Sequence, residues 1–183
     1  METKWIVIAV LAVIAIYVIV VFNRLIRGRN LVREGWSGID VQLRRRSDLI
    51  PNLVEIVKGY ASHERSVFEE VTAKRTAAMS AGSVPQKAAA EQALQGSIGK
   101  LFAVAEAYPQ LKANQNFLEL QKQMAELEDQ LQMARRYYNG TVRDYNIHIQ
   151  TFPDVLVARV TGFHEEHFFQ IDEASAANPN VKF

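Results

Sequence analysis

One apolar run near the start of the chain constrains the fold more than any other feature. Residues 5–22 are eighteen residues without a charged side chain, and thirteen of them are Ile, Val, Leu or Phe. As a helix, such a run would span about 27 Å, close to the ~30 Å hydrocarbon core of a bilayer. At roughly −0.4 kcal/mol per large apolar residue, it favours insertion by about 5 kcal/mol. The run predicts a transmembrane helix, and we assign residues 1–26 to an anchor.

The flanks of the run indicate how the anchor is used. A cleaved signal usually has an apolar region of ~7–15 residues that ends at small residues. Here the run ends at Phe22 and Asn23 without an Ala-x-Ala site, which favours an uncleaved anchor. Lys4 precedes the run, and four arginines follow it: Arg24, Arg27, Arg29 and Arg33. This charge bias predicts a short N-terminus outside and a C-terminal domain in the cytoplasm. The same four arginines are candidates for contact with anionic lipid headgroups, worth ~1 kcal/mol each near the surface, although topology determination alone also explains them.

Charge and cysteine content exclude several classes of function. Over all 183 residues, 21 basic side chains are balanced by 20 acidic ones, which argues against a general nucleic-acid binder. Cysteine is absent, so there is no disulfide framework, thiolate metal site or cysteine nucleophile.

The first part of the remaining chain has the pattern of a long amphipathic helix. Apolar residues recur at steps of three or four from residue 32 to residue 78, with Arg46, Glu64 and Arg75 as interruptions. Pro51 removes a backbone donor within this stripe and clashes with the previous turn. We therefore expect a kink or short break near residues 47–50. Gly82 is expected to end this region.

Local signals predict three more helices. Ser83 and Gln86 form a capping box that begins a helix running to about residue 107. Asn114 or Asn116 caps a third helix that ends at Pro153. A fourth helix is expected over residues 154–161, closed by Gly162, although its VLVARV sequence also fits a short strand.

These elements define the expected fold class, which is all-α. Amphipathic helices joined by short loops bury their stripes against each other, so an antiparallel, up-and-down, four-helix-bundle-like domain is the natural result. We assign residues 27–170 to this bundle, after the transmembrane helix. We expect a flexible tail over residues 171–183.

No motif in the chain predicts an enzyme. His164 and His167 are three residues apart, whereas a zinc-binding His-Glu-x-x-His helix places its histidines four apart. The glycines at Gly96 and Gly99 are explained more simply by helix packing than by phosphate binding. Nucleophile elbows, phosphate-binding loops and dinucleotide fingerprints are absent. We expect no catalytic, cofactor-binding or metal-binding residues.

Polar residues on otherwise apolar helices form the remaining candidate site. Two Tyr-Asn pairs lie seven residues apart, on one side of the third helix, and the first helix carries further polar residues near Pro51. The candidates are Asp40, Arg44, Asp48, Asn52, Arg135, Tyr138, Asn139, Tyr145 and Asn146. They form either a groove for a ligand or partner or a buried network that fixes helix register. We favour the network because no catalytic geometry is visible.

Several motifs in order resemble the LemA family. They are the runs at residues 39–64, 108–113 (YPQLKA) and 134–139 (ARRYYN), then Tyr145-Asn146, Phe152-Pro153 and the Gly162-Phe163 and Phe168-Phe169 pairs. The resemblance covers nearly the whole chain. It implies a bacterial membrane-anchored bundle of four helices in the inner (cytoplasmic) membrane. Some relatives are associated with forming or shaping internal membranes, including magnetosomes, but the resemblance implies little about activity.

The functional expectation is a non-enzymatic, single-pass membrane protein whose cytoplasmic bundle is a scaffold or membrane-organising module. Its expected partners are membrane lipids, further copies of the chain and other membrane proteins, with no nucleic acid. Gly28, Gly35 and Gly38 would allow close approach between copies beside the membrane. The alternatives are a ligand or peptide sensor that uses a polar groove and an enzyme of unknown type.

Overall fold

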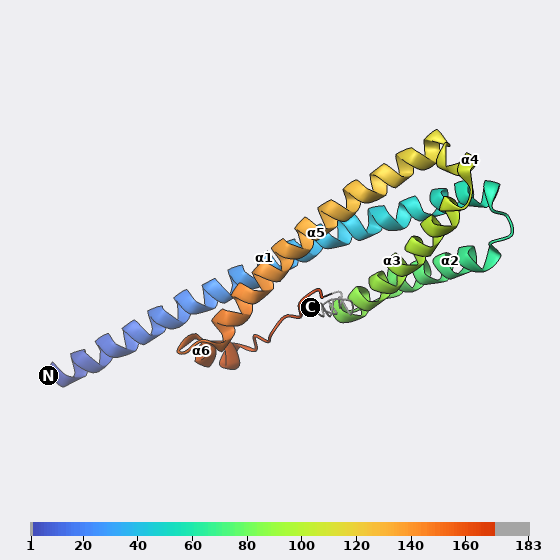
Figure 1. Ribbon diagram of the computed structural model, residues 1–183. Coiled ribbons are helices and arrows are strands. Elements are labelled where there is room, and N and C mark those ends of the chain that lie inside the picture. Colours follow the sequence, from blue (N-terminus) through green and yellow to red (C-terminus); the bar gives the residue numbers. More distant parts are fainter. Residues whose placement is uncertain (1, 171–183) are drawn as a thin grey trace, which may run out of the picture. The chain divides into compact units, whose positions relative to one another are not determined.

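The computed structural model describes residues 2–170, and every regular element in this part of the chain is a helix. Residues 171–183, where a flexible tail is expected, lie outside the described residues. The helices are α1 (Glu2–Tyr60), α2 (Arg65–Ser80), α3 (Val84–Glu106), α4 (Pro109–Lys112), α5 (Gln115–Gln150) and α6 (Asp154–Thr161) (Figure 1). The predicted all-α class is confirmed, and the strand alternative for VLVARV is excluded because α6 covers it.

Helix α1 continues through Pro51, so of the kink or short break predicted near residues 47–50, the break does not occur. A proline at residue 51 has no N–H to donate to the carbonyl of Ser47, four residues earlier. The Nε of Arg75, on α2, donates to that carbonyl at 2.7 Å. Because another helix supplies the missing donor, the carbonyl of Ser47 is satisfied and the helix does not end there.

The interruption in the long stripe lies instead at residues 61–64, between α1 and α2. The N–H of Ala61 still bonds to the carbonyl of Val57 at 2.9 Å, and the N–H of Glu64 bonds to that of Ala61 at 3.1 Å. Val57 and Val71, on either side of the turn, are buried in one apolar cluster. The apolar stripe therefore continues from one helix to the next, which is why its period does not reveal the turn.

The other helix ends follow the predicted local signals. The side chain of Ser83 accepts from the N–H of Gln86, and the side chain of Gln86 accepts in return, which completes the capping box. The side chain of Asn114 accepts from the N–H groups of Asn116 and Phe117 before α5. Gly162 closes α6 with a φ of +73°, a left-handed conformation that favours glycine. A short helix, α4, fills the turn at Pro109.

The described chain divides into two compact units. Unit 1 contains residues 2–40 and 132–168, and unit 2 contains residues 41–131 with residues 169–170. Unit 2 buries an apolar cluster that draws on five helices and includes Leu53, Val71, Leu101, Leu111 and Phe117. In unit 1, the buried side chains include Leu25, Tyr138, Val142, Tyr145 and Val157.

Close contacts fix the antiparallel pairing of α1 and α5 within unit 1. Gly28 lies against the ring of Tyr145, and Gly35 lies against the backbone of Tyr138. As the α1 position advances by seven residues, the α5 position falls by seven. The two helices therefore run in opposite directions in a matched register. The Trp36 ring also packs on Tyr138, with 5.6 Å between ring centroids.

Candidate functional site

The apolar run of α1 is exposed over nearly its whole length, with Val21 near its end as the buried exception. Residues 2–20 are all exposed, and α1 is the one helix among the described residues that is long and apolar enough to cross a membrane. Large aliphatic side chains that face outward on every side of a helix have no place in a water-soluble surface. This arrangement suits a lipid environment.

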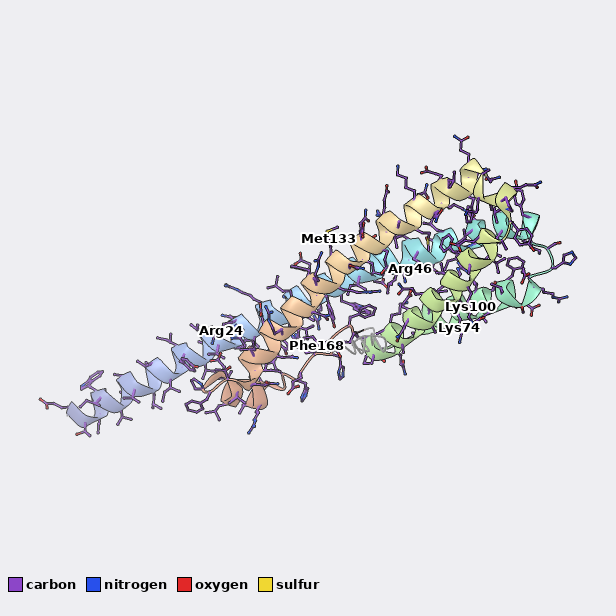
Figure 2. The ribbon with its side chains drawn as sticks, in the orientation of Figure 1. Arg24, Arg46, Lys74, Lys100, Met133 and Phe168 are labelled. Atoms are coloured by element: carbon purple, nitrogen blue, oxygen red, sulfur yellow. The ribbon has the colours of Figure 1, made fainter. Side chains whose placement is uncertain are left out.

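A carboxylate from α6 lies beside the end of the apolar run. Asp154 is buried, and its Oδ1 accepts a hydrogen bond from the Tyr17 hydroxyl at 2.7 Å. Arg24, labelled on α1 in Figure 2, donates to its Oδ2. The Nδ1 of His148 lies 4.0 Å from that oxygen. In the sequence, Asp154 is recognisable only as the first residue of a helix, so this cluster was not predicted.

The four arginines predicted to contact lipid headgroups therefore lie in different environments. Arg24 is bound to Asp154 and remains partly exposed, and the Arg29 guanidinium lies 4.9 Å from the Phe163 ring centroid. Arg27 and Arg33 are exposed on α1. Two of the four thus also make contacts within unit 1.

Two of the predicted polar residues, Asn146 and Tyr138, hold the segment after α6 against α5. The side chain of Asn146 bonds twice to the backbone of Glu166, donating to its carbonyl at 2.9 Å and accepting from its N–H at 3.0 Å. The Tyr138 hydroxyl donates to the carbonyl of His167 at 2.7 Å. Burial and the nearby charge of Glu166 raise the pKa of Tyr138 to about 12, and they also raise that of Tyr145.

The contacts just described, to the backbone of residues 166–167, do not include the other predicted polar residues. Asp40, Arg44, Arg135 and Asn139 each have a partner in the structure. Asp48 and Asn52 are exposed on the part of α1 that belongs to unit 2. The structure thus brings Tyr138 and Asn146 together on the backbone of residues 166–167, whereas Tyr145 lies against Gly28.

Unit 2 contains a buried charged cluster that sequence analysis did not assemble. Arg46, also labelled in Figure 2, donates to Glu128 of α5, and its Nη1 lies 3.6 Å from the Oε2 of Glu91 of α3. Arg46 and Glu91 are each only 2% exposed. A signal was present in the sequence, because each of these helices has a charged residue on its apolar face, and α5 has two, Glu128 and Arg135. The pairing of those charges depends on how the helices pack.

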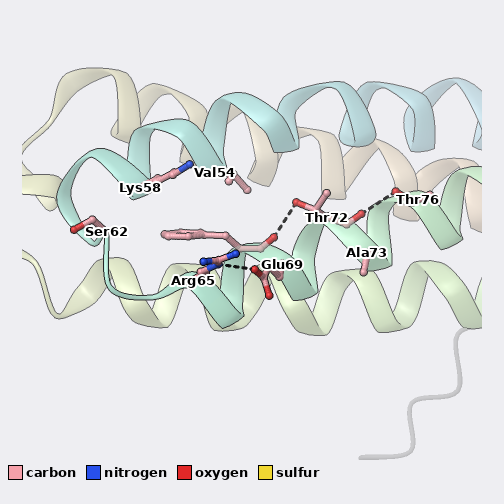
Figure 3. Close-up of a pocket in the computed structure, with 9 residues that line it drawn as sticks. Val54, Lys58, Ser62, Arg65, Glu69, Thr72, Ala73 and Thr76 are labelled. Atoms are coloured by element: carbon pink, nitrogen blue, oxygen red, sulfur yellow. Dashed lines mark hydrogen bonds and ion pairs between the residues drawn. The ribbon is translucent and has the colours of Figure 1, made fainter.

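An open groove lies between α1 and α2 in unit 2 (Figure 3). Its volume is about 710 Å³, and its lining is formed by Val54, Lys58, Ser62, Arg65, Phe68, Glu69, Thr72, Ala73 and Thr76. Arg65 and Glu69 form an exposed ion pair at 2.8 Å on its rim. None of the predicted polar candidates lines this groove.

Comparison with known proteins identifies the family. A sequence profile of the LemA family matches residues 35–183. Magnetosome protein MamQ 2 of Paramagnetospirillum magneticum is 29% identical over 192 residues, which cover 90% of this chain and 71% of that protein. Protein LemA of Metamycoplasma hominis is 25% identical over 156 residues, which cover 82% and 69% of the two chains.

Fold and sequence together define the class of protein: a helical, membrane-associated protein whose first helix contains a bilayer-length apolar segment. The chain belongs to the LemA family, as its motifs predict.

Proposed function

We propose that the protein is a single-pass, non-enzymatic membrane scaffold, held in the bilayer by residues 5–22. The exposed apolar run of α1 carries this proposal, because those side chains need lipid around them. The likeness to magnetosome proteins supports a place at an internal or inner bacterial membrane. Self-association of anchored copies would then organise the membrane or its proteins, since confinement in two dimensions raises their effective concentration.

The orientation follows from the arginines after the run. Arg27 and Arg33 are exposed, as charges that meet the cytoplasmic leaflet should be. The helical domain then lies in the cytoplasm, where protease added to intact spheroplasts cannot reach it. Digestion of the domain in intact spheroplasts would show that the orientation is the opposite of the proposed one.

The anchor is tested by placing two charges in its centre. Val13→Arg with Ile14→Arg adds about 5–7 kcal/mol to the cost of insertion, which cancels the gain from the apolar residues. The variant should leave the carbonate-washed membrane fraction, whereas Met79→Arg with Leu118→Arg, at exposed positions of unit 2, should stay there. Retention of the first variant would refute anchoring by this segment.

Scaffolding is tested by the mass of the full-length protein in anionic nanodiscs and in mild detergent. Oligomers that grow with protein density in the nanodisc are the expected result. A strict monomer in every condition would refute self-association and leave the sensor as the better explanation.

A ligand or peptide sensor is the second candidate, and the groove between α1 and α2 is the observation that favours it. Lys58 and Arg65 would bind an acidic ligand there, Arg65 by exchanging its ion pair with Glu69, beside the largely buried ring of Phe68. Lys58→Glu with Arg65→Glu should abolish the binding of an acidic peptide library while the free energy of unfolding stays unchanged. Equal binding by this variant and the parent protein would remove this candidate.

A further inference from the structure

Helix α6 has one buried face and one apolar exposed face. Asp154, Val157 and Ala158 are buried in unit 1. Leu156 and Val160, four residues apart, are 54% and 88% exposed. Phe152, four residues before Leu156, is 75% exposed. A spacing of four places Leu156 and Val160 along one side of α6, where they form an apolar ridge on the outside of unit 1. Phe152 lies in the turn before α6 and adds a further exposed apolar side chain.

Three contacts tie α6 to one level of α1. Asp154 binds Tyr17 and Arg24. The Phe163 ring, just after α6, packs edge-on against the Phe22 ring, with centroids 5.8 Å apart. Phe22 ends the apolar run, Arg24 follows it, and Tyr17 lies five residues before its end.

This level corresponds to the boundary of a membrane that contains the run. Tyr17 and Arg24 are separated along the helix by about 10 Å. The last apolar residue of the run, Phe22, lies between them. Interfacial helices bury their apolar face about 5–10 Å into the boundary between headgroups and acyl chains. The contacts of α6 therefore place it within that same zone.

We propose that α6 is an interfacial membrane helix whose ridge of Leu156 and Val160 inserts among the lipids of the leaflet next to Arg24. The proposal rests on the proposed anchoring by residues 5–22. A bilayer is the occupant that the contacts favour, because the apolar run, which itself needs lipid, is already beside α6. Arg159, exposed on α6, supplies a cation for anionic headgroups. The ridge is the second membrane contact of unit 1.

The absence of cysteine from the chain allows a direct measurement of depth. Single variants Leu156→Cys and Val160→Cys of the full-length protein are labelled with an environment-sensitive fluorophore in vesicles with anionic lipid. Lipids that carry a nitroxide near the headgroup or deep in the acyl chain serve as quenchers. Val13→Cys, in the middle of the run, reports on the anchor. Leu118→Cys, which is 50% exposed on unit 2, is the matched control.

The expected result is strong quenching at residues 156 and 160 by the shallow nitroxide, at residue 13 by the deep one and at residue 118 by neither. If residue 13 is quenched by lipid nitroxide while residues 156 and 160 are quenched only by aqueous iodide, the interfacial position of α6 is overturned and the anchor is not. Protection of residues 156 and 160 from both lipid and iodide would assign the ridge to a second copy and also overturn it. Absence of lipid quenching at residue 13 would refute the anchor and this inference together.

Discussion

Gly35 of α1 lies directly against the backbone of Tyr138 on α5: a Cβ at residue 35 would be 3.1 Å from the Tyr138 Cα. The same relationship recurs one heptad away, where a Cβ on Gly28 would be 3.1 Å from Cδ2 of Tyr145. Gly28 and Gly35 therefore allow close approach within one chain. Gly38 is the third glycine predicted to serve contacts between copies. A Cβ at residue 38 would meet no neighbouring atom within 4 Å, so this position stays available for such contacts.

Gly35→Ala should destabilise the protein, whereas Gly38→Ala should not. The added methyl group at residue 35 meets a backbone atom that cannot turn aside, so we expect a loss of about 1–3 kcal/mol. At residue 38 the space is open, and alanine is the better helix former by up to ~1 kcal/mol. Denaturant unfolding of the full-length protein in detergent measures both. Equal stability of the two variants would contradict this close packing.

Arg75 should be coupled to Pro51 through the carbonyl of Ser47. Arg75→Met removes the donor to this carbonyl and should cost about 1–3 kcal/mol. Pro51→Ala restores the N–H that a helix normally supplies, so the same Arg75→Met change should cost less in that background. A double-mutant cycle on the free energy of unfolding measures the difference. Strict additivity would show that the two residues act independently.

The buried cluster in unit 2 should be sensitive to the loss of its cation. Arg46→Met removes the buried cation that lies 3.6 Å from Glu91, for which the expected cost is roughly 3–5 kcal/mol. Adding Glu91→Leu and Glu128→Leu should recover much of that loss, because the site then becomes apolar. Thermal unfolding of the single and triple variants tests this order. A triple variant less stable than the single one would mean that the carboxylates have other essential partners.

Tyr138 should make the protein less stable in strong alkali. Its pKa in the folded chain is about 12 against an ordinary value of 10.0, so the fold favours the protonated hydroxyl. Below pH 10 both states are protonated and the contribution is fully present. Between pH 10 and 12 the unfolded chain ionises first, and stability falls. Relative to Tyr138→Phe, the parent should lose stability over this window, while Tyr137→Phe, at an exposed position, should follow the parent.

The elements that sequence analysis located correctly have local causes. The Ser83–Gln86 capping box, the Asn114 cap and the left-handed Gly162 each act within a few residues of the helix end they define. The continuity of α1 through Pro51 depends instead on Arg75, a donor 28 residues from Ser47 in sequence. No local pattern contains such information.

The same distinction holds for the candidate sites. The heptad spacing of Tyr138 and Tyr145 indicated a shared helix face, but the backbone of residues 166–167 that Tyr138 and Asn146 hold could not be inferred from spacing. Asp154 had the appearance of an ordinary first-turn acid. Its pairing with Arg24 spans 130 residues, so it required the tertiary structure.

The composition of unit 1 sets an order for its biosynthesis. Its two parts, which end at Asp40 and begin at Gln132, are separated by unit 2 in the chain. At ~5–20 residues per second, translation of the intervening part takes on the order of ten seconds. The apolar run therefore leaves the ribosome well before Asp154 exists to meet Arg24. With the run anchored as proposed, insertion into the bilayer and closure of unit 1 are separate events, and a nascent chain stalled before residue 132 would be anchored yet unable to complete the unit.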